Sequence, residues 1–387
     1  MFKKFTAGIL SFLLIFTNVF GAESRQVNND VSAEIVTAPS AILIEQSTMQ
    51  VLYELEADRR MPIASVTKTM TMLLIMEAID SGKIKYSDMV TTSEHAASMG
   101  GSQVFLEVGE QMSVDEMLKS IAVSSGNDAA VAMAEHISGT EEAFVEQMNK
   151  RASQLGAKNT HFINCNGLNE TEEHYSTARD VALISAELLK HSGIEKYLTI
   201  WMDTIRNGSF GLSNTNKLIR FYEGANGIKT GSTDMAKYCL SASAKRNDMQ
   251  LIAVVLGAPS TADRFSSASK LLDFGFANYA IANNSSYKAE IQNVKVVGGT
   301  ENEVEAEIDG GLNAVVRKGS QDKITVKVKT EDKINAPVKK GDKIGEAVFY
   351  VDGKELTKRT VVAKKDVEEI GCFQMFGRCL LKWVKLY

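Results

Sequence analysis

The distribution of apolar residues predicts two kinds of structure in succession along the chain. Between about residues 38 and 278, segments with strand patterns are mixed with segments with helical patterns. Residues 41–45 and 49–55 resemble the two arms of a hairpin, residues 70–79 are apolar nearly all round, and residues 250–256 form a continuous apolar run. These patterns predict a hairpin, a helix buried on every side and a strand at the centre of a sheet.

After about Ser286 the pattern changes to strands alone. Residues 304–308 and 324–328 alternate apolar and polar side chains, and Asp352-Gly353 is a two-residue hairpin signal. Helical patterns longer than two turns return only in the C-terminal segment. We therefore expect a mixed helix-and-strand domain followed by an all-β domain of about eighty residues.

The two ends of the chain predict export and attachment to a membrane surface. Residues 1–21 place Lys3 and Lys4 before an apolar run and small residues, as a cleaved signal peptide does; a buried N-terminal helix is the alternative. The run is too short for a bilayer core of about 30 Å. In residues 367–387 an aromatic-rich face lies opposite a cationic face, which predicts an amphipathic helix in the headgroup region; a helix packed on its own domain is the alternative.

Composition and charge exclude several classes of protein. The 387 residues are 44% hydrophobic and 24% charged, which is typical of globular proteins and excludes a disordered chain. The formal net charge of -5 gives no reason to expect a nucleic acid partner. Four cysteines are too few for a disulfide scaffold, the pairing of Cys165 with Cys239 stays open, and the five histidines lack ligand spacing. We expect neither a metal nor another cofactor.

A serine and a lysine open the buried helix as Ser65-Val-Thr-Lys68. Three residues make almost one turn, so the Ser65 hydroxyl and the Lys68 amine share a face. Serine needs a base to become a nucleophile, and lysine can be that base only when an apolar site or a second cation lowers its pKa. Alone the motif is weak, because Ser-x-x-Lys occurs four times, beginning at Ser65, Ser267, Ser285 and Ser320.

Two further motifs carry groups that suit the same chemistry. Ser125-Gly126-Asn127 stands where one helix ends and another begins, and offers a hydroxyl for proton relay and a carboxamide for a substrate amide. Lys229-Thr230-Gly231 follows a glycine turn, on or beside an edge strand, where its side chains suit a carboxylate and its glycine lets a substrate backbone approach. Taken singly, the first motif is better explained as a plain turn and the second as an ordinary exposed strand.

Together the three motifs resemble those of the serine acyl-transferases that react with penicillin. Residues 174–189, residues 224–246 and the β-rich tail are similar to those of the low-molecular-weight D-alanyl-D-alanine carboxypeptidases. The resemblance implies an α/β catalytic domain, an antiparallel sheet with surrounding helices, over residues 22–285. A small all-β domain over residues 286–366 and the terminal amphipathic helix then follow.

The resemblance also implies a role for each motif residue. Ser65 attacks the carbonyl between the last two D-alanines of a peptidoglycan stem peptide, Lys68 accepts its proton, and Ser125 helps to pass that proton to the departing D-alanine. Substrate is held through its amide, its terminal carboxylate and an oxyanion hole made by the N–H groups of Ser65 and Ser232. The substrate-binding residues implied in this way are Asn127, Lys229, Thr230, Gly231, Ser232 and Arg264.

The resemblance to this family also suggests partners and rival functions. β-lactam antibiotics are implied as covalent inhibitors, and endopeptidase activity on cross-linked stems stays open. A β-lactamase shares the motifs, but the position of its deacylating glutamate before Leu168-Asn169 is Cys165 here. A non-catalytic wall-binding protein is opposed by the presence of Ser65, Lys68 and Lys229. The sequence departs from the usual family pattern at Cys165-Asn166-Gly167-Leu168, Asn226 and Lys237, and none of these departures removes a catalytic group.

Overall fold

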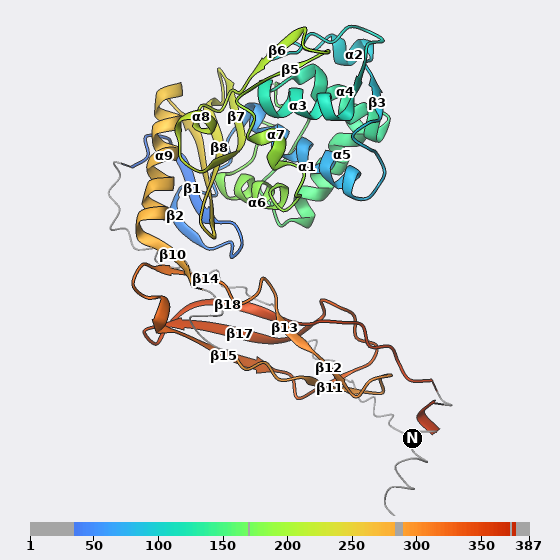
Figure 1. Ribbon diagram of the computed structural model, residues 1–387, viewed down its shortest axis with the longest axis vertical. Coiled ribbons are helices and arrows are strands. Elements are labelled where there is room, and N and C mark those ends of the chain that lie inside the picture. The colour runs from blue at the N-terminus through green and yellow to red at the C-terminus, as the bar shows by residue number, and fades with distance from the viewer. Residues whose placement is uncertain (1–34, 169–170, 283–288, 372–373, 377–387) are drawn as a thin grey trace, which may run out of the picture.

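The chain folds into a mixed helix-and-strand part followed by a β-rich part (Figure 1). The computed structural model describes residues 35–168, 171–282, 289–371 and 374–376. The α/β and all-β architectures predicted from the sequence are both present. The expected signal peptide lies outside the described residues. The expected C-terminal helix over residues 367–387 is wrong at its start, because Val367 and Glu369 form β-bridges with Val338 and Gly299. Residues 374–376 are helical, and residues 372–373 and 377–387 lie outside the described residues.

A five-stranded antiparallel sheet forms the centre of the first part. β9 is its middle strand, as the apolar run predicts, because alternate side chains of β9 enter cores on the two faces of the sheet. β7 is an edge strand, so one of its sides is free of a neighbouring strand within this sheet. In sheet order the strands are β2 Val51–Leu55, β1 Ser40–Glu45, β9 Met249–Ala258, β8 Lys237–Arg246 and β7 Ala225–Thr233.

Helices cover both faces of this sheet (Figure 1). α9, Thr261–Asn278, packs on one face, and α1, Lys68–Asp80, and α6, Ala178–Leu188, pack on the other. α1 is buried along almost its whole length, as its apolar sequence predicts, because further helices surround it. These helices are α3 Val114–Ser124, α4 Asn127–Ser138 and α5 Glu141–Gln154.

Side-chain hydrogen bonds cap the first turn of two helices, α3 and α6. The Ser113 hydroxyl accepts from the backbone N–H of Glu116 at 3.2 Å, and the Thr177 hydroxyl accepts from that of Asp180 at 3.0 Å. Shorter elements complete this part: η1 Ala64–Thr67, α2 Glu94–Ala97, α7 Glu195–Leu198, α8 Leu218–Phe221, the pair β3 Met89–Thr91 and β4 Gln111–Ser113, and the pair β5 Met202–Ile205 and β6 Phe210–Ser213.

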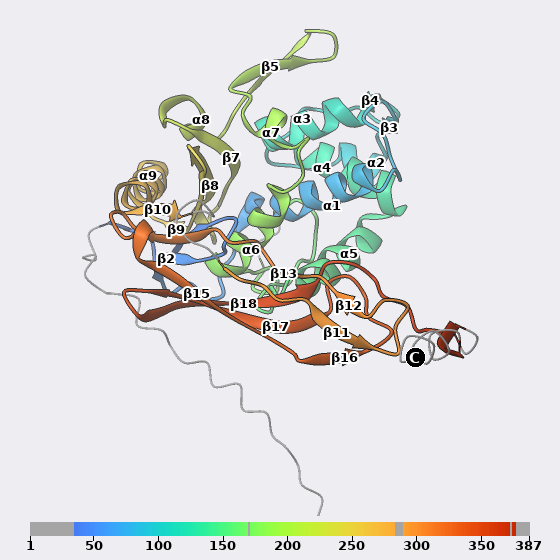
Figure 2. The same cartoon turned by 60° about the horizontal axis from the view of Figure 1, so that its bottom comes forward.

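The β-rich part has its own apolar core and is built from small sheets (Figure 2). Asp352 and Gly353, with φ of 50° and 76°, form the predicted turn between β17 and β18. The predicted alternation over residues 304–308 is divided between two strands in different sheets, because β12 pairs with β11 and β13 with β18. The elements are β10 Tyr279–Ala282, β11 Val294–Val297, β12 Glu303–Val304, β13 Ala306–Ile308, β14 Ala314–Arg317, η2 Gln321–Lys323, β15 Ile324–Thr330, β16 Lys333–Asn335, β17 Lys343–Val351 and β18 Lys354–Ala363.

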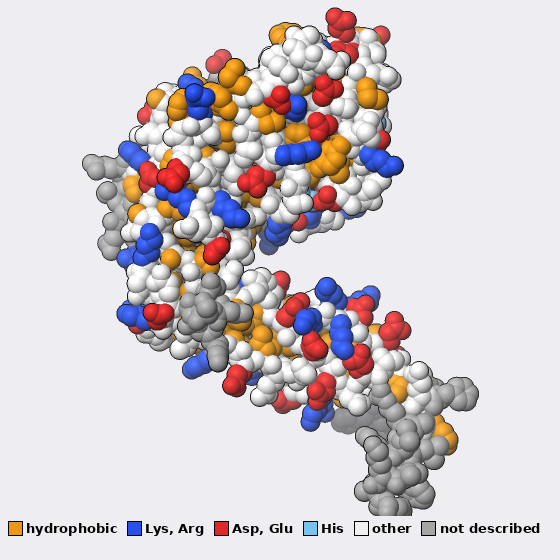
Figure 3. Space-filling view, in the orientation of Figure 1, with side chains coloured by type: hydrophobic (Ala, Val, Ile, Leu, Met, Phe, Trp, Pro, Cys, Tyr) orange, Lys and Arg blue, Asp and Glu red, His pale blue; other side chains and the backbone are white. Residues whose placement is uncertain are grey.

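The surface carries charges of both signs over both parts, interspersed on the face in view (Figure 3). β10 follows α9 directly and pairs with β14, so this strand connects the two parts. Of the helices in the described residues, none has the length and apolarity needed to cross a membrane.

Candidate active site

Ser65 and Lys68 lie at the start of the buried helix, close enough for a hydrogen bond. The chain enters α1 through the 3-10 turn η1, which contains Ser65, and Lys68 is the first α-helical residue. A 3-10 turn has three residues per turn, so positions 65 and 68 align along its axis better than in an α-helix. The Lys68 Nζ to Ser65 Oγ distance is 2.9 Å. Ser65 is partly exposed, whereas Lys68 is fully buried.

Two carbonyl oxygens fix the Lys68 amine in its buried position. Nζ lies 2.5 Å from Asn127 Oδ1 and 2.7 Å from the backbone oxygen of Asn166. Burial lowers the pKa of Lys68 to about 7, against the opposing effects of Cys165 and Asp128. At neutral pH, a large fraction of Lys68 therefore carries no charge.

The arrangement directs the lone pair of neutral Lys68 at Ser65. Carbonyl oxygens only accept hydrogen bonds, so the two N–H groups of a neutral amine go to Asn127 and Asn166. The third contact of Nζ, with the Ser65 hydroxyl, is then left for the lone pair. In this state the amine accepts a hydrogen bond from the serine, which is the geometry that a general base requires.

The Ser125-Gly126-Asn127 motif forms the predicted break between two helices. Ser125, with a left-handed φ of 62°, ends α3, and Asn127 begins α4. The Asn127 backbone N–H donates to Ser102 O at 2.7 Å, and its Nδ2 donates to Gly100 O at 2.8 Å. Asn127 therefore connects Lys68 to the segment that begins at residue 100, a contact that the sequence analysis did not predict.

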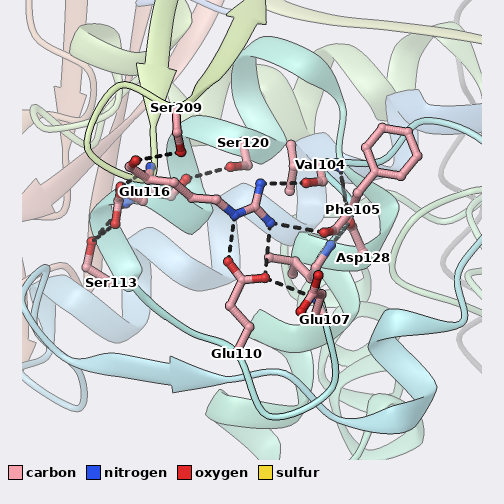
Figure 4. Close-up of polar contacts among 11 residues, drawn as sticks. Val104, Phe105, Glu107, Glu110, Ser113, Glu116, Ser120, Asp128 and Ser209 are labelled. Carbon is pink, nitrogen blue, oxygen red and sulfur yellow. Dashed lines mark hydrogen bonds and ion pairs between the residues drawn. The ribbon is translucent and has the colours of Figure 1, made fainter.

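A buried carboxylate next to Asn127 holds the same segment (Figure 4). Asp128 Oδ2 accepts from the backbone N–H groups of Val104 at 3.0 Å and Leu106 at 3.1 Å. On the other side, Arg206 at the end of β5 donates to Val104 O at 2.8 Å, to Phe105 O at 3.1 Å and to Glu110. The motif loop is thus linked through residues 104–106 to the β5–β6 hairpin.

Strand β7 brings the Lys229-Thr230-Gly231 motif against the turn that carries Ser65. A Cβ atom on Gly231 would lie 2.7 Å from Ile63 O and 2.9 Å from Ser65 N, so only glycine permits this approach. Lys229 is buried, and burial lowers its pKa well below the usual range, with Lys68 as a further cause. Thr230 Oγ1 donates to Thr215 Oγ1 at 2.7 Å.

Arg264 lies in α9, behind the edge of β7. Its Nη1 donates to Gly231 O at 3.1 Å and to Cys239 O at 3.4 Å, and its side chain is largely buried. In this structure the guanidinium therefore supports the strand that carries the motif, while Ser232, the next residue of that strand, is exposed. A part for Arg264 in binding a carboxylate stays a prediction.

The loop of residues 164–168 covers Lys68, and sequence analysis did not find its function. The loop supplies the backbone oxygen of Asn166 to Lys68. Every residue type has such an oxygen, so the sequence gives no signal for this contact. The nearest signal is Gly167, whose φ of +77° and close approach to Ala64 and Thr67 require a glycine. Cys165 and Cys239 are both buried and free, so they do not pair.

A serine hydroxyl in contact with a buried lysine amine is the arrangement expected of a serine hydrolase. Among the described residues, no group of three or more His, Cys, Asp or Glu side chains is placed to hold a metal ion. Residues 27–260 match the D-alanyl-D-alanine carboxypeptidase family, and residues 282–369 match the C-terminal domain of penicillin-binding protein 5.

Similar proteins extend these matches over most of the chain. The sequence is 45% identical over 387 residues to the D-alanyl-D-alanine carboxypeptidase DacF of Bacillus subtilis, covering 99% of each chain. The fold is similar to penicillin binding protein 5 from Haemophilus influenzae, with a TM-score of 0.74, 34% identity and coverage of 88% of this chain and 100% of the other. The chain belongs to the D-alanyl-D-alanine carboxypeptidase family, and it is a serine hydrolase of the penicillin-binding type.

Proposed function

We propose that this D-alanyl-D-alanine carboxypeptidase uses Ser65 to remove the last D-alanine from peptidoglycan pentapeptide stems. The observation that carries the proposal is the 2.9 Å contact between Ser65 Oγ and a buried Lys68 amine whose other two partners only accept. Gly231 brings the open edge of β7 beside Ser65, where an extended peptide can pair with the strand.

The proposed reaction uses the motif residues in turn. Lys68 takes the Ser65 hydroxyl proton as Oγ bonds to the carbonyl carbon, and the N–H groups of Ser65 and Ser232 stabilise the oxyanion. When the intermediate collapses, the carbon–nitrogen bond breaks, and the proton passes through Ser125 to the amine of the departing D-alanine. Water then hydrolyses the ester and frees Ser65 with the shortened peptide.

Substrate binding is proposed for residues around the same point. Asn127 holds the amide of the penultimate residue, although its own amide is bound to Lys68 and Gly100 in this structure. Thr230 and Lys229 attract the terminal carboxylate, and Arg264 supports them from behind the strand. β-lactam antibiotics acylate Ser65 because they present a carbonyl and a carboxylate in the same arrangement.

Location and domain limits are proposed from the sequence. The protein is exported after removal of residues 1–21, and residues 367–387 attach it to the outer face of the membrane. We assign the catalytic domain to residues 22–285 and the β-rich domain to residues 286–366.

Two experiments test the reaction. A pentapeptide ending in D-Ala-D-Ala is incubated with the protein, and mass spectrometry is expected to show the loss of one alanine. A fluorescent penicillin is expected to label the wild type and not Ser65→Ala. An unlabelled wild type that leaves the peptide intact would contradict the proposal and would favour a non-catalytic wall-binding protein.

A further inference from the structure

The residue before the nucleophile has an unusual backbone conformation. Ala64 has a φ of 47°, in the left-handed region that residues with a Cβ rarely adopt. Such a conformation persists only where the surroundings hold it, and it is often found at functional sites. Something other than local preference must therefore fix the peptide unit between Ala64 and Ser65.

Two buried side chains hold this peptide unit. The Thr67 hydroxyl donates to Ala64 O at 2.7 Å, and His174 Nε2 lies 2.7 Å from Thr67 Oγ1. Since the one hydroxyl proton of Thr67 goes to Ala64, His174 Nε2–H is the donor in the second contact. The backbone N–H of Ile163 donates to the other ring nitrogen, Nδ1, at 3.3 Å, which fits the same neutral tautomer.

The surroundings leave this chain of hydrogen bonds little freedom. His174 is 2% exposed and Thr67 is 1% exposed, and the imidazole packs edge-on against Phe162 with ring centres 5.8 Å apart. Gly167 covers the contact, because a Cβ there would lie 2.7 Å from Thr67 Oγ1 and closer still to Ala64 O. The loop that supplies the Asn166 oxygen to Lys68 is thus packed on the same peptide unit.

The geometry of a peptide bond connects this contact to catalysis. Ala64 O and Ser65 N–H belong to one planar unit, in which the C=O and N–H bonds point in opposite directions. A hydroxyl that fixes the carbonyl therefore also fixes the direction of the Ser65 N–H. Ser65 N lies on the side of β7, where a Cβ on Gly231 would approach it to 2.9 Å.

We propose that Thr67 and His174 are positioning residues, which orient the Ser65 N–H toward the oxyanion that forms between the turn and β7. The inference rests on the proposed role of Ser65 as nucleophile. It predicts that loss of either side chain slows formation of the acyl-enzyme and leaves the preceding non-covalent binding of the β-lactam nearly unchanged, because the oxyanion exists only after attack.

The test compares variants of nearly equal shape by stopped-flow acylation with a fluorescent penicillin. Thr67→Val removes the hydroxyl and keeps the volume, and Thr67→Ser keeps the hydroxyl. Thr69→Val is the matched control, because Thr69 is also buried, lies two residues further along, and has a hydroxyl without a hydrogen-bond partner among the described residues. His174→Phe and the double variant with Thr67→Val complete the set.

Thr67→Val is expected to lower the acylation rate constant at saturating penicillin by about tenfold to a hundredfold. Thr67→Ser and Thr69→Val are expected to stay within about twofold of the wild type, and His174→Phe to fall between. The double variant is expected to be no slower than Thr67→Val, because the two residues act as one unit. Melting temperatures show whether each variant is folded.

The inference would be overturned by a folded Thr67→Val that acylates at the wild-type rate, or by Thr67→Ser as slow as Thr67→Val. If Thr67→Val does not fold, His174→Phe decides by the same rate comparison. Labelling of the wild type but not of Ser65→Ala shows that the proposed function holds even where this inference fails. An unlabelled wild type contradicts the proposed function itself.

Discussion

At the scale of single residues, the proposed reactivity of this site depends on the buried Lys68 amine having no carboxylate in direct contact. Lys68 is surrounded by neutral acceptors, from Asn127 and Asn166, rather than by a carboxylate in direct contact. A carboxylate within hydrogen-bond distance would stabilise the ammonium form and remove the base. The nearest acid on its neighbour helix, Asp128, is turned away and binds the backbone N–H groups of Val104 and Leu106.

Lys68 is the proposed base, so its removal is expected to leave Ser65 without activation. Lys68→Ala is expected to lower the second-order rate constant of acylation by a fluorescent penicillin by about a thousandfold or more. Lys83→Ala, an exposed lysine after the end of α1, serves as the control. Near-normal acylation in a folded Lys68→Ala would refute the assignment of the base.

His174 makes the stability of the protein depend on pH. Burial, with smaller effects of His161 and Lys68, lowers the pKa of His174 to about 4, from an ordinary value of about 6.5. The unfolded chain then binds the proton first as the pH falls, so the stabilisation is complete above pH 6.5 and is lost by about pH 4. The expected loss in the free energy of unfolding is about 3 kcal/mol over this range.

Denaturant unfolding at a series of pH values measures this effect. His174→Phe has no imidazole at this position, so its curve is expected to lack this part of the fall. Parallel curves for the wild type and His174→Phe would show that His174 is protonated as easily in the folded protein as in the unfolded chain.

Residue types in sequence order indicated the motif side chains but not what connects them. Ser65, Lys68 and the two other motifs were singled out because their residue types and spacing resemble those of a known family. The Asn166 oxygen was missed because every residue has a carbonyl. The contact of His174 with Thr67 was missed because it joins positions 107 residues apart.

At the scale of elements, the site depends on segments that contain none of the candidate catalytic or binding residues. Helix starts are set locally, since a cap such as Ser113 acts within four residues. Strand pairing is decided by distant partners, and for that reason the single alternating pattern over residues 304–308 did not reveal that it forms two strands in different sheets. The β5–β6 hairpin likewise reaches the Asn127 loop only through tertiary contacts (Figure 4).

Arg206 is expected to hold residues 104–106 in place from the β5–β6 hairpin, and through them the loop that contains Asn127. Arg206→Ala leaves the Val104 and Phe105 carbonyls without their partner, so we expect about a tenfold slower acylation together with a loss of stability. Arg151→Ala is the control, because Arg151 is also a partly buried arginine, and it pairs with Glu77 and Glu187 between other helices. Stability should fall in both variants, and the acylation rate only in the first. Equal rates in both would limit Arg206 to a structural role.

At the scale of the whole molecule, the ends of the chain are expected to decide where the enzyme works. Truncation before Gly371 removes most of the predicted amphipathic helix, so we expect the protein to be released from anionic vesicles in a sedimentation assay while acylation stays normal. Full-length protein with Lys382→Glu and Lys385→Glu should bind less tightly, because the attraction to anionic lipid is reduced. A truncated protein that still sediments with vesicles would show that another surface is the anchor.

The central claim is that Lys68 is uncharged beside Ser65 at neutral pH, and the pH dependence of acylation tests it most directly. Since the pKa of Lys68 is lowered to about 7, the second-order rate constant for a penicillin is expected to rise about tenfold per pH unit below 7 and to level off above it. A rate constant that does not change between pH 5 and 9, or that rises only above about pH 10 as for an ordinary lysine, would contradict the account.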